Sequence, residues 1–200
     1  MGGVIMEKYE ELSLNIRSAF RLLAHYNQRI LNLMNHISVK LSLPPLYDNS
    51  PWWCEPIIKN SRNLEKRYTT MSWLPMFFHE FHFGNSNVQF SVFIQSDSGS
   101  WEVEDWDDID SYMDFNSSKT RFLFAVTNSS RWDVNDDVYR EENWKDFLKD
   151  EYVITRNRKT IVCKSFELID FKDEKTTNDT ILNYVEYVKT KGINNIEYIE

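Results

Sequence analysis

Residues 6–42 read MEKYEELSLNIRSAFRLLAHYNQRILNLMNHISVKLS, and the rest of the chain is organised around this stretch. Its apolar residues are separated alternately by three and four positions, which keeps them on one side of an α-helix. They form a continuous seam: Tyr9, Leu12, Ile16, Ala19, Leu23, Tyr26, Ile30, Leu33 and Ile37. Because no proline or glycine interrupts the run before Pro44-Pro45, the sequence predicts one long helix.

The predicted length of this helix raises the question of what covers the seam. At about 1.5 Å per residue the helix is roughly 50 Å long, whereas a compact chain of this size is roughly 40 Å across. The helix is therefore expected to lie across the whole domain, to bend, or to project and pair with another chain. We divide the chain into a helix over residues 1–43, either an arm or packed across the sheet, and a body over residues 44–200.

Composition and charge narrow the class of protein. A hydrophobic content of 42% and an aromatic content of 15% suffice for a core. Residues 1–95 carry nine Lys or Arg and seven Asp or Glu, whereas residues 96–200 carry fourteen and twenty-four. Free nucleic acid is not an expected partner, because phosphate binding needs a surplus of cations.

Two cysteines cannot form a disulfide scaffold, and no secretory signal or membrane-spanning run is visible, so we expect a cytoplasmic protein.

The body shows mainly hairpin signals. The clearest hairpin pairs 76–83 with 88–95 around Gly84-Asn85-Ser86-Asn87, with Phe83 opposite Val88. Further strands are expected over 120–127, 152–156, 159–171 and, at the edge, 193–199. Helices are expected over 57–70, 100–115, 139–149 and from 181 to Gly192, with a charged turn over 173–178. The predicted fold class is α+β, with the long N-terminal helix followed by a mainly antiparallel sheet and flanking helices.

The sharpest compositional feature is the acidic segment, residues 97–114, in which carboxylates are interleaved with aromatic residues and no Lys or Arg occurs. Calcium loops need a central glycine that 105–110 lacks, so no metal site is expected there. The segment is either an ordinary acidic helix face or a recognition surface for a basic protein, with aromatic contact area and attracting charge. The predicted recognition residues are Trp101, Glu102, Glu104, Asp105, Trp106, Asp107, Asp108 and Asp110.

Catalytic motifs are scarce. The five glycines form no nucleotide-binding loop, so no cofactor is expected. Within the predicted hairpin, His79 and His82 point to opposite faces, which defeats shared metal coordination. Glu80 and His82 share a face with a polar row: Gln89, Ser91 and Gln95. That row is either a solvated sheet face or an acid–base site.

Two functions from different classes follow. The preferred hypothesis is a non-enzymatic interaction protein, of the inhibitor or immunity type or a complex subunit. It binds a basic protein through the acidic segment, and it self-associates or docks a partner helix through the seam. The alternative is a divalent-metal nuclease or phosphodiesterase that uses Glu80, His82, Asp97, Glu167 and Asp170. No Glu-x-Lys follows Asp97 on the next predicted strand, which weakens that alternative.

Overall fold

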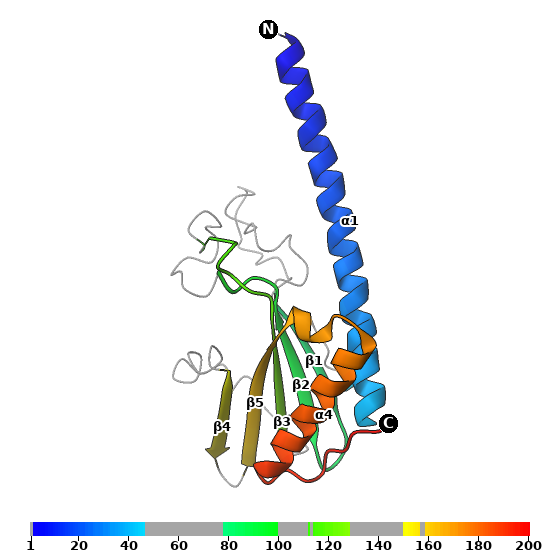
Figure 1. The fold of residues 1–200 in the computed structure, drawn as a ribbon, viewed down its shortest axis with the longest axis vertical. Helices are drawn as coiled ribbons and strands as arrows, with labels where there is room; N and C mark the ends of the chain where they lie inside the picture. The colour runs from blue at the N-terminus through cyan, green and yellow to red at the C-terminus, as the bar shows by residue number, and fades with distance from the viewer. Residues whose placement is uncertain (1, 47–77, 100–111, 113, 129–149, 157–158) are drawn as a thin grey trace, which may run out of the picture. The chain divides into compact units, whose positions relative to one another are not determined.

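A computed structural model describes residues 2–46, 78–99, 112, 114–128, 150–156 and 159–200 (Figure 1). It divides into two compact units, Met1–His36 and Ile37–Glu200. The long N-terminal helix is confirmed as α1, Gly2–Leu41, which starts in the first unit and ends in the second. No helix in the described part of the chain is long and apolar enough to cross a membrane.

Helix α1 ends through a local reversal of the backbone. Ser42 adopts a left-handed φ of 50°, and the Leu43 amide donates to the carbonyl of Ser38 at 3.1 Å. The Ser38 hydroxyl in turn donates to the carbonyl of Leu43 at 2.7 Å. These bonds satisfy groups that the last turn of a helix leaves without intrahelical partners.

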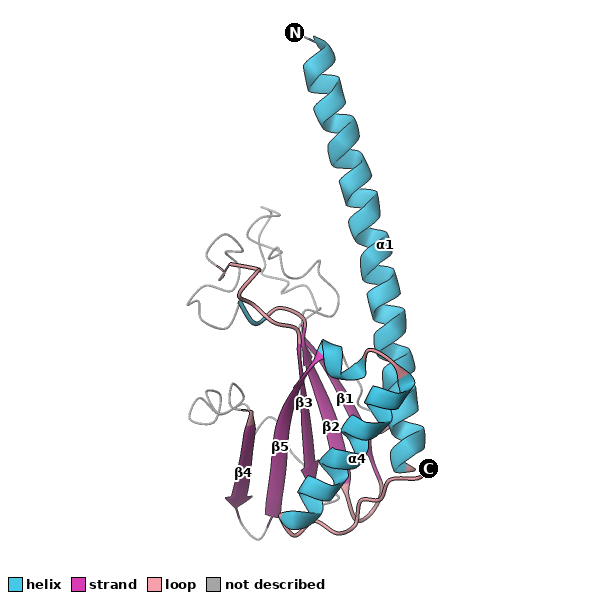
Figure 2. Cartoon of the chain, viewed as in Figure 1, coloured by secondary structure: helices cyan, strands magenta, loops and turns pink. Residues whose placement is uncertain are grey.

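The body contains one antiparallel sheet, so the predicted α+β class is confirmed (Figure 2). Its strands lie in the order β1-β2-β3-β5-β4. Their bounds are Phe78–Gly84 for β1, Gln89–Gln95 for β2, Arg121–Thr127 for β3, Glu151–Arg156 for β4 and Lys159–Glu167 for β5. The strands predicted over 120–127 and 152–156 are confirmed as β3 and β4; both are short runs with aromatic and β-branched residues, which are typical of strands.

The register of the β1–β2 hairpin differs by two residues from the prediction. Phe83 pairs with Phe90, where the sequence had placed it opposite Val88. The Asn85 amide donates to the Val88 carbonyl at 3.0 Å, and the Asn85 side chain accepts from the Asn87 amide at 2.9 Å. The turn is therefore centred one residue further along the chain than predicted. A shift of two residues leaves every side chain on its predicted face, so the facial assignment holds.

Three predictions about the C-terminal region are wrong. The strand predicted to reach Phe171 ends at Glu167, and Leu168–Phe171 forms a short 3-10 helix, η5. The charged turn predicted over 173–178 is the start of α4, Glu174–Thr190, because the Asp173 side chain accepts from the Thr176 amide at 2.8 Å and caps the helix.

The edge strand predicted over 193–199 is absent. Ile193 and Ile196 are instead buried in irregular chain, each 1% exposed. The predicted helix end is confirmed, since α4 stops at Thr190 and Gly192 takes a φ of 89°, which favours glycine.

Helix α4 packs on one face of the sheet through an aromatic cluster. The ring of Tyr184 lies 6.0 Å from that of Phe90, 5.3 Å from that of Phe124 and 6.0 Å from that of Phe166. The Tyr184 hydroxyl donates to the carbonyl of Val162 at 2.9 Å. Burial raises the pKa of Tyr184 well above its usual value, so the hydroxyl keeps its proton and remains a donor.

The helices predicted over 57–70 and 139–149 lie outside the described residues. Most of the helix predicted over 100–115 lies outside them too. The described end of that range is not helical: Phe115 sits in a turn closed by the Ser117 amide donating to the Asp114 carbonyl at 2.8 Å.

Tyr184→Phe is expected to lower the free energy of unfolding by about 1 to 2 kcal/mol, because the buried hydrogen bond from the Tyr184 hydroxyl to the Val162 carbonyl is lost while ring packing is kept. Tyr198→Phe is the control, because the Tyr198 ring over the Lys40 ammonium does not require the hydroxyl. Urea denaturation measures both variants. Equal stability of the two variants would contradict the assigned role of the Tyr184 hydroxyl.

Candidate functional site

The polar row predicted from alternation is present, and a contact network links three of its side chains. We call Glu80, His82 and Ser91 the polar network. His82 pairs with Ser91 across the β1–β2 ladder, and its Nδ1 lies 2.7 Å from the Ser91 hydroxyl oxygen. His82 Nε2 lies 2.8 Å from Glu80 Oε1. Glu80 and His82 point to the same face because they are two residues apart on one strand.

The polar network is buried. Glu80 is 2% exposed, His82 8% and Ser91 0%, so the interpretation of a solvated sheet face is wrong. Glu80 Oε1 makes no well-aligned hydrogen bond with a described residue although it lies 2.8 Å from Nε2, so the contacts place a carboxyl group, an imidazole and a hydroxyl in a row. This is the acid–imidazole–hydroxyl order of nucleophilic triads. A nucleophile must also meet its substrate, and the Ser91 hydroxyl has no exposed surface.

The face that carries the polar network continues into an apolar cluster. Phe93, Leu123, Ala125, Ile161 and Cys163 are all buried there, on the side of the sheet opposite the Tyr184 contacts. Burial raises the pKa of the Cys163 thiol to about 12, so it is not a thiolate nucleophile near neutral pH. The other cysteine, Cys54, lies outside the described residues.

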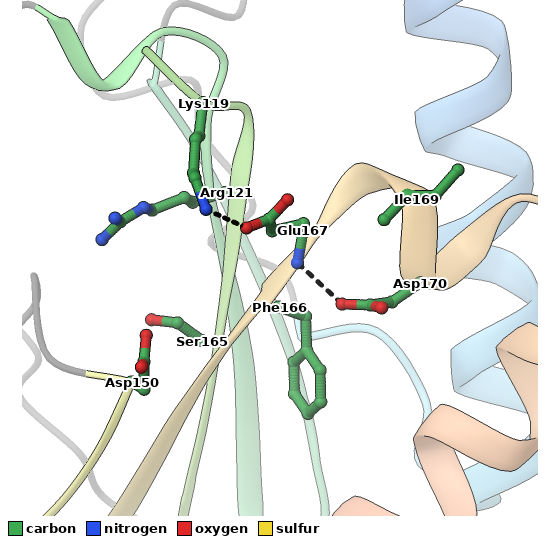
Figure 3. A pocket seen from close by; sticks show the side chains of 8 residues that line it. All are labelled: Lys119, Arg121, Asp150, Ser165, Phe166, Glu167, Ile169 and Asp170. Atoms are coloured by element: carbon green, nitrogen blue, oxygen red, sulfur yellow. Dashed lines mark hydrogen bonds and ion pairs between the residues drawn. The ribbon is translucent and has the colours of Figure 1, made fainter. Parts of the chain in front are cut away.

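A polar pocket of about 400 Å³ lies at one end of β3 and β5 (Figure 3). Lys119 forms an ion pair with Glu167, and the Asp170 side chain accepts from the Glu167 amide at 2.9 Å. The remaining lining residues are Arg121, Asp150, Ser165, Phe166 and Ile169. Sequence reasoning singled out Glu167 and Asp170 but missed the two cations, which the Arg121–Glu167 pairing brings opposite them.

The five residues of the metal-dependent alternative are not brought together. Glu80 lies on β1 and Glu167 on β5, three strand spacings apart, which is at least about 14 Å. The Asp97 side chain accepts from the Gly99 amide at 2.8 Å, in the loop after β2. Within the described ranges, no group of three or more His, Cys, Asp or Glu residues could hold a metal ion.

The predicted recognition residues Trp101–Asp110 lie outside the described residues. The ends of the acidic segment are described. Asp97 lies in the loop after β2, and the Asp114 side chain accepts from the Asn116 amide at 3.2 Å. The structure therefore places the two ends of the acidic segment and none of its tryptophans.

The seam of α1 is divided into an exposed and a buried part. Tyr9 is 66% exposed, Leu12 53% and Ile16 48%. Leu23 and Tyr26 are half-buried. From Ile30 onward the seam residues are buried: Ile30, Leu33 and Ile37. We call Tyr9 to Tyr26 the distal seam.

The polar network is expected to show energetic coupling between Glu80 and Ser91 through His82. Glu80→Ala and Ser91→Ala should each destabilise the protein, because each removes a polar contact of the buried imidazole. The loss of unfolding free energy in the double variant should be smaller than the sum of the two single losses by about 0.5 to 3 kcal/mol. Urea denaturation measures all three variants. Strict additivity would show that the three side chains act independently.

Comparison with known proteins gives one family. Neither the curated proteins nor the solved structures yield a match to this chain. The model of the PM0109 family matches residues 6–195, which covers the helix α1 seam, the whole sheet and α4. The chain therefore belongs to the PM0109 family.

Proposed function

We propose that this chain is a non-enzymatic protein-interaction module, an inhibitor or immunity-type protein or a subunit of a larger complex. The observation that carries the proposal is the exposure of the distal seam. Three successive seam residues, Tyr9, Leu12 and Ile16, expose about half or more of their surface in the same heptad phase. Aligned exposed apolar residues of this kind mark protein contact surfaces.

The energetics support a protein partner for this face. Fully burying one large apolar side chain contributes about 1.5 to 3 kcal/mol. Phe20 and Leu22, beside the distal seam, are 69% and 66% exposed and add to the available area. A partner helix could therefore gain several kcal/mol from covering this face, which offsets part of the entropic cost of association.

The acidic segment is the second proposed contact surface. The chain carries a net charge of −8, and residues 96–200 hold ten more acidic than basic residues. A field of this sign attracts a basic protein and raises its encounter rate. Trp101 and Trp106 would supply aromatic contact area within the same segment. The support for this surface is its charge and composition.

The combined substitution Asp105→Asn, Asp107→Asn and Asp108→Asn is expected to weaken binding of a basic partner about five- to tenfold at low salt, since three rim charges are lost. Binding is measured as the amount of each basic protein that the immobilised chain retains from lysate of its native host. The difference between wild type and variant should shrink at high salt, because screening removes the charge contribution.

A matched control removes the same charge elsewhere. Asp179→Asn, Glu186→Gln and Glu197→Gln neutralise three exposed carboxylates on α4 and the C-terminal segment. This control should retain basic proteins as wild type does. Equal retention by all three proteins would reject the acidic surface. A rise in melting temperature with Mg²⁺ or Mn²⁺ that Glu167→Gln abolishes would instead favour the metal-dependent alternative.

A further inference from the structure

We infer that the distal seam pairs with a second copy of this chain as a parallel, in-register, two-stranded coiled coil. The inference rests on the proposed function, in which α1 is a contact surface, and it names the occupant of that surface. The evidence is the heptad phase of the seam, the identity of its residues, and the charge of the positions beside it.

The spacing of the seam is that of a coiled coil. Strict alternation of three and four residues averages 3.5, which keeps apolar residues facing a partner helix that supercoils with α1. In heptad terms the a positions are Tyr9, Ile16 and Leu23, and the d positions are Leu12, Ala19 and Tyr26. Among parallel coiled coils, Ile at an a position with Leu at the neighbouring d position favours two strands over three or four.

The flanking positions are compatible with a copy of the same helix. The e and g positions between Leu12 and Leu23 are occupied by Ser13, Asn15, Phe20 and Leu22. None of them is charged, so two identical helices can approach without like-charge repulsion. The same positions carry no charge pattern that would select a different helix. Phe20 and Leu22, which are highly exposed, would become covered on pairing.

Burial sets the extent of the contact. The seam is buried from Ile30 onward, so only residues up to about Tyr26 are open to a second copy. Tyr9 to Tyr26 covers roughly two and a half heptads, or about 27 Å of helix. Helical contacts of this length are marginal on their own. The dimer is therefore reversible, and its population depends on protein concentration.

Parallel pairing has a consequence for partner binding. Both chains continue into residues 37–200 from the same end of the helix pair. Two acidic segments are then attached to one dimer, and a partner with two basic sites gains avidity through effective concentration. Self-association through α1 would in this way strengthen the binding proposed for the acidic segment.

The mass of the full-length chain in solution tests the inference. Light scattering over a concentration series should show wild type moving from the chain mass of 24.0 kDa towards twice that value. Ile16→Asp should remain at the chain mass at every concentration. Leu14→Asp is the matched control, because Leu14 is 59% exposed but occupies an f position on the opposite side of the helix. This control should dimerise as wild type does.

Orientation is tested by cross-linking in a background with Cys54→Ser and Cys163→Ala. Leu12→Cys should give a covalent dimer on oxidation, since parallel in-register helices place the two d positions together. Leu14→Cys should not. In an antiparallel pair, Leu12 of the two copies would be about 16 Å apart. A mixture of Leu12→Cys with Leu23→Cys would then cross-link, and parallel pairing would be overturned.

The outcomes separate the two proposals. A chain mass that stays at 24.0 kDa at all concentrations overturns the dimer. If Ile16→Asp nevertheless loses a protein that wild type retains from host lysate, the seam binds another partner and the proposed function stands. If wild type is monomeric and neither Ile16→Asp nor the acidic substitutions change retention, both proposals fail.

Discussion

The burial of one apolar stripe on α1 is the constraint that connects the fold of this chain to its proposed role. Ile30 and Ile37 are fully buried, whereas Tyr9, in the same heptad phase, is 66% exposed. Apolar area is costly in water wherever it lies along a helix, so the same physical requirement applies at both ends. The structure buries this stripe from Ile30 to Leu41, and we propose that another molecule covers the distal seam.

Periodicity made the elements predictable, but it could not set the hairpin register. The faces of β1 and β2 follow from period two, and they are as predicted. A two-residue shift preserves those faces, so the register is decided only by the local hydrogen bonds of the turn, here those of Asn85.

The polar character of 173–178 suggested a turn, although Asp173 followed by Thr176 is also a helix-capping pattern. The isoleucines of 193–199 suggested an edge strand, yet this segment is irregular chain.

The candidate sites, like the secondary-structure elements, could be predicted from the sequence only in part. Strand alternation was enough to place Glu80 and His82 on one face, and the structure brings them to 2.8 Å. Alternation carries no information on whether a face is covered, so the burial of these side chains could not be foreseen. The polar pocket depends on Arg121 pairing with Glu167, two residues far apart in the sequence. Only the assembled sheet reveals that Lys119 and Arg121 stand opposite the acids of β5 and η5.

Burial also separates the features that stabilise the fold from those that can meet a partner. In the polar network, His82 contacts both Glu80 and Ser91 at a site with almost no exposed surface, which suits a role in fixing the β1–β2 pairing. The two proposed contact surfaces differ in physical character. Association through the distal seam is apolar, and salts that strengthen apolar burial should not weaken it. Binding through the acidic segment is electrostatic and is screened by salt. Ionic strength therefore distinguishes the two surfaces without any substitution in the chain.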